Sequence, residues 1–188
     1  MPGMKCYITD NNSYLTYGSS YLYISDNNEV TFGDGIIYHT VTIGTQTWIT
    51  TNFMMDIPTY SKLVSPEDAT NGIGRMYQQA AVSAISEAIA PYGWRVASIS
   101  DFSALAAFVV NDGKNMPLSI KSVSWDGTDD YGLGIVKSHS VSAGAGLTET
   151  NYWTTDTYQR FYLRESTEYG YDQREASEWN NIRILKDN

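Results

Sequence analysis

The chain is poor in cysteine, in basic residues and in long apolar runs, and each shortage excludes a class of protein. Its single cysteine, Cys6, cannot form an internal disulfide. Only 12 lysines and arginines stand against 21 aspartates and glutamates, a formal net charge of -9. We therefore expect no nucleic-acid partner, because such binding depends on basic side chains that neutralise phosphates. No apolar run approaches the length of about 18 residues that a membrane-spanning helix needs, so we expect no membrane span.

Signals for export, metal binding and catalysis are also missing. Residues 1–7 contain neither a basic start followed by an apolar stretch nor a small-residue cleavage site, so we expect no secretory signal. The two histidines, His39 and His139, have no cysteine or second histidine at metal-ligand spacing, and we expect no metal and no cofactor. No serine lies in a Gly-x-Ser-x-Gly elbow. The chain is therefore expected not to be an enzyme.

What is abundant is tyrosine and glycine, with 15 residues of each among 188. Aromatic residues make up 13% of the chain and charged residues only 18%, a balance that favours strands and turns over long exposed helices. The length suits one domain with a full core, since two separate cores would leave each half small. We expect an α+β fold with an additional arm.

An internal repeat marks that arm. Residues 7–18 and 23–33 share a pattern displaced by 16 positions, in which apolar and polar residues alternate around an Asp-Asn-Asn turn. Such a turn is typical of a β-hairpin, so we expect two small hairpins in residues 1–33. Because hairpins bury little by themselves, this arm is expected to serve attachment or oligomerisation on its own domain, another subunit or a larger assembly. The alternative is a simple N-terminal extension of the main sheet.

The remaining chain, 34–188, contains strand and helix signals in a clear order. Residues 35–53 form two β-rich runs broken at Gly44-Thr45, which predicts a hairpin, and residues 54–74 are expected to be loop. Apolar residues recur at helical spacing over 75–90, and Pro91 ends the run. A second helix is expected from an N-cap at Ser100 to Gly113. Beyond it we expect only turns and short strands.

Several segments resemble a known family in the same order along the chain. Residues 35–48 read Gly-Ile-Ile-Tyr-His-Thr-Val-Thr-Ile-Gly-Thr-Gln-Thr-Trp, followed by Gly-Arg-Met-Tyr at 74–77, Pro-Tyr-Gly-Trp-Arg-Val at 91–96, Ser-Asp-Phe at 100–102, Gly-Thr-Asp-Asp-Tyr-Gly-Leu at 127–133, Tyr-Trp-Thr-Thr at 152–155 and Ile-Arg-Ile-Leu-Lys-Asp at 182–187. These segments resemble the Fibrobacter succinogenes major paralogous domain. The resemblance implies a C-type-lectin-like fold, with mixed antiparallel sheets and two helices, over residues 34–188.

The departures from the family pattern concern a disulfide and a histidine. Ala90 and Ile184 stand where the family often has cysteines, as suits a chain that does not depend on an oxidising compartment. Arg95 and Ala97 replace the family's histidine and proline, so a function that depends on that histidine is not carried over.

One interpretation of the polar residues near the C-terminal strand and in the 126–130 turn is a calcium site. Residues 178–181, Glu-Trp-Asn-Asn, resemble the Trp-Asn-Asp segment that supplies calcium oxygens in sugar-binding C-type lectins, and Asp126, Asp129 and Asp130 could add carboxylates. The companion tripeptide, Glu-Pro-Asn or Gln-Pro-Asp, is missing, and Asn181 stands in place of a carboxylate. We therefore favour a polar turn before the last strand.

The irregular segment from Lys114 to Arg174 is expected to carry the binding face, because loops vary without disturbing a core. Aromatic rings beside short polar side chains are typical of sugar-binding and protein-binding surfaces. The expected ligand-binding residues are Trp125, Asp126, Asp129, Asp130, Tyr131, Tyr158 and Tyr169. The alternative is that such aromatics belong to the core, as expected for Trp153 and Tyr162, and that Trp48, Trp94 and Trp125 are core residues or loop anchors.

These observations favour a virion-associated lectin-like protein, such as a bacteriophage head or tail decoration or fibre. Phage structural proteins leave the cell by lysis and need neither an export signal nor a disulfide. The arm would contact other virion or surface proteins, and the domain a glycan or a receptor protein; a homo-oligomer stays open. The alternative is a bacterial cell-surface adhesin or carbohydrate-binding module.

Overall fold

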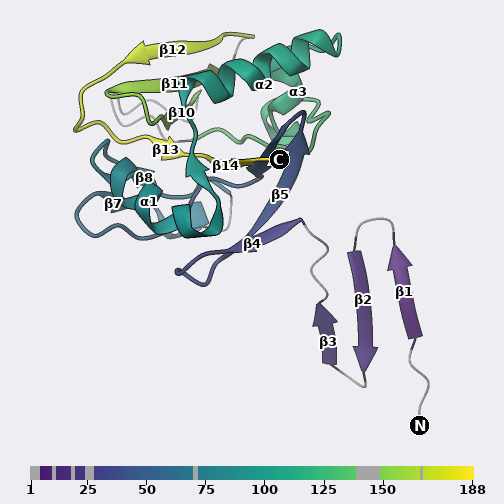
Figure 1. Ribbon diagram of the computed structural model, residues 1–188. Helices are drawn as coiled ribbons and strands as arrows, with labels where there is room; N and C mark the ends of the chain where they lie inside the picture. The colour runs from purple at the N-terminus through teal and green to yellow at the C-terminus, as the bar shows by residue number, and fades with distance from the viewer. Residues whose placement is uncertain are drawn as a thin grey trace.

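The computed structural model describes residues 5–9, 12–17, 20–23, 28–69, 72–138, 149–165 and 167–188. Over these residues the protein is an α+β structure with several antiparallel sheets and three short α-helices (Figure 1). The strands are β1 (Lys5–Thr9), β2 (Asn12–Tyr17), β3 (Ser20–Tyr23), β4 (Glu29–Thr31), β5 (Ile37–Ile43), β6 (Gln46–Ile49), β7 (Ser61–Lys62), β8 (Met76–Tyr77), β9 (Arg95–Val96), β10 (Glu149–Trp153), β11 (Gln159–Arg164), β12 (Tyr169–Gln173), β13 (Asn181–Ile182) and β14 (Ile184–Asp187). The helices are α1 (Ala81–Ile89), α2 (Ile99–Asn111) and α3 (Met116–Ile120), with single 3-10 turns η1 (Pro66–Ala69), η2 (Ala90–Tyr92) and η3 (Val123–Trp125).

A five-stranded sheet, in the order β4-β5-β6-β14-β9, divides the interior into two cores. Neighbouring residues of a strand point to opposite faces, so Trp48 packs in one core while Ile49 packs in the other. Leu185 and Ile184 of β14 divide in the same way. We call the two the α2 core and the α1 core, after the helix that covers each. The sheet is therefore buried on both faces at its centre.

The first expected helix begins later in the structure. Met76 and Tyr77, which have helical spacing with the residues that follow, instead form β8 and pair with β7. The Tyr77 N–H also donates to the Asn180 carbonyl at 2.7 Å, and the Asn180 N–H donates back at 2.9 Å. These bonds hold the backbone extended, so α1 begins at Ala81 and the expected start at residue 75 is wrong. Part of the expected 54–74 loop is also a strand: Ser61–Lys62 forms β7 by pairing with β8.

The second expected helix is present, with a different N-cap. The Ser98 hydroxyl accepts a hydrogen bond from the Asp101 N–H, and the Asp101 carboxylate accepts one from the Ser98 N–H. This reciprocal capping box places the start of α2 at Ile99 rather than after Ser100. Arg95 pairs with both Asp101 and Asp187. That contact ties β9 to α2 and β14.

The third helix contradicts the expectation that only turns and short strands follow α2. α3 begins at an Asn115 N-cap, whose side chain accepts a hydrogen bond from the Leu118 N–H. Pro117 lies in the first turn, where its missing N–H is no disadvantage.

None of the helices among the described residues is long and apolar enough to cross a bilayer.

The two copies of the repeat pair differently. In the first copy β1 and β2 form the expected antiparallel pair, and β3 pairs with β2 in the same three-stranded sheet. In the second copy β3 and β4 belong to different sheets: β3 pairs with β2, and β4 pairs with β5 of the central sheet. Phe32, which follows β4, is 5% exposed and packs in the α1 core. Residues 29–33 thus pack with the domain rather than with the arm; the turn residues 10–11 and 24–27 lie outside the described residues.

A second sheet, in the order β12-β11-β10-β13, closes the α2 core from the other side. Phe161 of β11 stacks on Phe102 of α2 with ring centroids 4.2 Å apart. β10, β11 and β12 are antiparallel neighbours, and Gln159 pairs with Gln173. The turn before β11 and the loop after β12 therefore leave the same end of this sheet.

Candidate functional site

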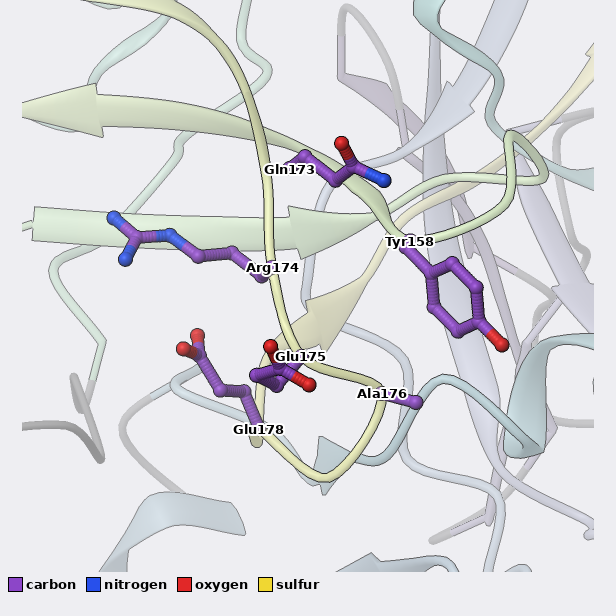
Figure 2. A pocket seen from close by; sticks show the side chains of 6 residues that line it. All are labelled: Tyr158, Gln173, Arg174, Glu175, Ala176 and Glu178. Atoms are coloured by element: carbon purple, nitrogen blue, oxygen red, sulfur yellow. The ribbon is translucent and has the colours of Figure 1, made fainter.

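That sheet end carries a pocket of about 510 Å³. It is lined by Tyr158, Gln173, Arg174, Glu175, Ala176 and Glu178. Figure 2 shows the Tyr158 ring on one side of the loop and the Arg174 and Glu178 side chains extending to the other, with Gln173 and Glu175 between them. An aromatic ring, an amide and carboxylates thus share one concave surface.

Tyr158 stands on the rim in an unusual backbone conformation. Its φ is 60°, in the left-handed region that residues with a Cβ rarely adopt, and its side chain is 45% exposed. The Tyr158 carbonyl accepts a hydrogen bond from the Arg174 N–H at 2.8 Å, which joins the turn to the loop opposite. Strained backbone with an exposed aromatic ring is the kind of local cost that functional sites retain.

The turn that presents Tyr158 is fixed to the helix below it. The Asp156 carboxylate accepts a hydrogen bond from the Ile99 N–H at the start of α2, at 2.8 Å. The Thr154 hydroxyl donates to the Gln159 carbonyl at 2.9 Å and closes the turn. These bonds fix the turn from which the Tyr158 ring projects.

Beneath the pocket lies a buried ion-pair network. The Arg160 side chain is 3% exposed and donates from Nε to the Asp172 carboxylate at 2.7 Å and from Nη1 to the Asn180 side-chain oxygen at 3.3 Å. Arg174 reaches the same Asp172 carboxylate from the pocket wall at 2.8 Å. Burial raises the pKa of Asp172, but the Arg160 hydrogen bond and the two cations outweigh it, so this pKa lies below its ordinary value.

The loop that forms the other wall is anchored on the segment before α1. The Gln79 N–H donates to the Ala176 carbonyl at 3.2 Å, and the Gln78 amide donates to the Ser177 carbonyl at 3.2 Å. Lys62 lies over the Trp179 ring, 4.0 Å from its centroid, and burial lowers the pKa of its ammonium group. Both walls of the pocket are therefore held by bonds to well-packed elements.

The carboxylates around the pocket differ in how closely they are paired with cations. Asp172 is shared by two guanidinium groups, whereas Glu178 is 3.9 Å from the nearest one, that of Arg160. Among the residues that the structure describes, the exposed Glu175 has no ion-pair partner. The pocket thus offers a ligand one open carboxylate and one that is only weakly paired.

Of the seven expected site residues, Tyr158 lines this pocket and the other six do not. Trp125 is 2% exposed and packs in the α2 core, so its expected role in ligand contact is wrong and the alternative of a core residue is right. The physical reason is that η3 turns the indole inward, where the Lys121 ammonium lies 4.5 Å from the ring centroid. Gly127 permits this close packing, because a Cβ there would lie 2.1 Å from the Lys121 carbonyl oxygen.

The three expected aspartates lie outside the pocket, and the carboxylates of Asp129 and Asp130 have partners within the protein. Asp126 and Asp129 have left-handed backbones, and the Asp129 carboxylate accepts a hydrogen bond from the Gly134 N–H at 2.8 Å. Asp130 accepts from the Ser119 hydroxyl at 2.8 Å, which lowers the pKa of its carboxyl, and lies 3.6 Å from the Lys114 ammonium. In the described ranges, no three acidic, histidine or cysteine side chains gather as a metal site would need.

The two remaining tyrosines are half-buried. The Tyr131 ring packs edge-on against Phe108 and its hydroxyl donates to Asp112 at 2.7 Å; burial and this bond raise the pKa of Tyr131 to about 12. Tyr169 packs against the α2 core beside Phe161. Of the histidines, His39 lies 3.0 Å from Glu29 across β4 and β5, and His139 lies outside the described residues.

None of the other five pocket residues was among the expected ligand contacts. Gln173 and Arg174 end the expected binding segment and Glu178 belongs to the calcium alternative, whereas Glu175 and Ala176 were not singled out. The antiparallel pairing of β11 with β12 brings together the turn before β11 and the loop after β12. The sequence pattern along the chain does not show this pairing. Comparison with known proteins adds no relative: no family model, curated protein or solved structure matches this chain.

Proposed function

We propose that this chain is a non-catalytic binding module that holds a saccharide in the pocket at Tyr158. The observation that carries the proposal is an exposed aromatic ring, held at a strained backbone position beside open polar groups, in a pocket whose walls and floor are fixed. Saccharides are bound by aromatic rings that cover their apolar faces and by carboxylates and amides that bond their hydroxyls. The pocket supplies each of these groups.

A C-type-lectin-like fold is part of the proposal. The segments that resemble the family are collinear over residues 34–187, and β14 pairs with β6, so the beginning and the end of the domain meet in one sheet. Two longer helices, α1 and α2, cover opposite faces of that sheet. The proposed site lies in the loops at the end of the second sheet, where variation does not disturb the cores.

The biological setting we propose is a bacteriophage virion, with the domain as a head or tail decoration or fibre module. The three-stranded sheet β1-β2-β3 would provide the attachment, because so small a sheet needs another surface for stability. Mass spectrometry of purified virions tests this setting. Recovery of the protein from the bacterial envelope instead would favour a cell-surface adhesin.

The saccharide proposal is tested on a glycan array with the full chain and two variants. Tyr158→Ala should abolish binding, whereas Tyr60→Ala, which removes another exposed tyrosine, should leave it unchanged. Adding a chelator should not alter binding, because no carboxylate cluster suited to calcium is found in the described residues. Equal binding by wild type and Tyr158→Ala would reject this pocket as the site.

The arm is tested by two truncations that differ by a few residues. Deleting residues 1–27 should leave a stable domain that binds the saccharide but no longer attaches. Deleting residues 1–33 should destabilise the domain by about 3 kcal/mol or more, because it also removes the buried Phe32 and strand β4. Thermal unfolding of the two proteins separates these outcomes, and equal stability would show that β4 is dispensable.

A further inference from the structure

We infer that the pocket selects a saccharide with a free, protonated amino group, such as a glucosamine unit. This inference rests on the proposed function, because it specifies the ligand of the same site. It is carried by the distribution of charge over the pocket and its floor. A neutral pocket would show no such preference.

The two cations nearest the pocket are already occupied. Arg174 directs its Nε and a terminal nitrogen to Asp172 at 3.0 and 2.8 Å, and Arg160 approaches the same carboxylate from below. Their combined charge is partly cancelled by Asp172, which binds Nε and one terminal nitrogen of Arg174 and Nε of Arg160. An anionic sugar would therefore have to compete with this carboxylate for Arg174.

The two pocket carboxylates have little compensation. Glu178 is 3.9 Å from Arg160, and Glu175, exposed at the centre of the wall, has no ion pair with any residue that the structure describes. Counting Arg160, Arg174, Asp172, Glu175 and Glu178 gives two positive and three negative groups. The site thus carries one excess negative charge that a ligand ammonium group would balance.

The aromatic ring is placed for the same ligand. Tyr158 lines the pocket together with Glu175, and a cation over a tyrosine face gains an attraction in addition to its ion pair. Gln173 supplies an amide for a neighbouring hydroxyl group. The net charge of -9 on the whole chain adds a long-range attraction for cationic ligands.

Three trisaccharides with the same β-1,4 linkage make the test: one of glucosamine, one of N-acetylglucosamine and one of glucose. Affinity is measured by calorimetry on the full chain at about pH 6, where the glucosamine amine is protonated. We expect the glucosamine trisaccharide to bind about two- to five-fold more tightly than the other two, the range that one exposed ion pair contributes. Glu175→Gln, which keeps a side-chain oxygen for the hydroxyl groups but removes the charge, should lower the affinity for the glucosamine trisaccharide more than that for the glucose trisaccharide and so remove this preference.

The matched control is Glu87→Gln, which removes the same charge from an exposed residue of α1 that does not line the pocket. It should retain the preference; an equal loss in both variants would show general attraction to an acidic protein and overturn the inference. Binding of a trilysine peptide as tightly as of the glucosamine trisaccharide would overturn the assignment to a sugar. Equal binding of all three trisaccharides would reject the amine preference but keep the proposed function, whereas no binding of any saccharide would reject the proposed function itself.

Discussion

Residues 121–134 and the pocket rim both combine aromatic rings with carboxylates, but they differ in how open these groups are to a ligand. In residues 121–134 the indole of Trp125 is buried and the carboxylates of Asp129 and Asp130 accept hydrogen bonds from their own loop and from α3. In the pocket rim the Tyr158 ring is exposed and Glu175 has no ion pair within the described chain. The same residue types therefore form a packed loop in one place and a binding surface in the other. The difference is whether the carboxylates already have hydrogen-bond or ion-pair partners within the protein.

The largest expected effect is on the packed segment. Trp125→Ala should lower the free energy of unfolding by about 3–5 kcal/mol, because it leaves a cavity in the α2 core where the indole is 2% exposed. Denaturant unfolding measures this change. Val123→Ala, two residues earlier and 74% exposed, is the control and should cost less than about 0.5 kcal/mol. A similar small cost at Trp125 would return this residue to the list of surface contacts.

The next effect concerns the floor of the open segment. Arg160→Ala should cost about 2–3 kcal/mol, because it removes the buried partner of Asp172 and leaves Arg174 as the remaining ion pair of this carboxylate. Arg160→Met keeps the packing volume and should cost less. Arg164→Ala, on the same strand, removes an exposed ion pair with Glu168, a half-buried one with Glu149 and a contact over the Tyr162 ring, and should cost about 1 kcal/mol. Chemical denaturation of the three variants tests this order, and equal costs for Arg160→Ala and Arg164→Ala would contradict it.

A smaller effect appears on acidification. The folded-state pKa of Asp172 is lowered below the ordinary value of 3.8, so the carboxylate stabilises the fold above that value. This stabilisation is lost as the pH falls through the folded-state pKa. Between about pH 5 and about pH 2, Asp172→Asn should therefore lose less stability than wild type, as unfolding followed by circular dichroism would show. Parallel losses in the two proteins would mean that the network contributes no pH dependence.

The smallest change in stability, with a large change in binding, is expected at Tyr158. Tyr158→Gly relieves the positive φ and should alter stability by no more than about 1 kcal/mol, in the stabilising direction, while it removes saccharide binding. Tyr158→Ala keeps the backbone strain and should lose binding without that gain. Melting temperatures and affinities of the two variants decide the point; destabilisation by both would show that the ring supports the fold.

The sequence was most informative where neighbouring residues form one element. The hairpin of β5 and β6 around Gly44 and the end of α2 near Gly113 follow from turn residues and local spacing. It was least informative where distant segments decide. Met76 and Tyr77 have helical spacing but are held extended by Asn180. In the second copy of the repeat, β4 joins the central sheet through β5 while β3 pairs with β2.

At the binding face, too, local sequence predicted some residues and could not predict others. Tyr158 could be proposed from its type and its polar neighbours, but Glu175 and Glu178 enter the pocket only through the pairing of β11 with β12. Trp125 could not be assigned from its neighbours, since the exposed Asp126 beside it gives no sign that the indole turns inward. Burial depends on the register of the whole fold, which a local pattern does not contain.

The position of β14 has a consequence for the order in which the molecule is made. Ile184–Asp187 lies between β6 and β9 in the central sheet and supplies Ile184 to one core and Leu185 to the other. Until this strand has left the ribosome, β6 and β9 each lack a neighbour and neither core can close. The nascent chain must therefore hold more than 180 residues in an incomplete state, with apolar strand edges exposed, before the domain folds in one late step.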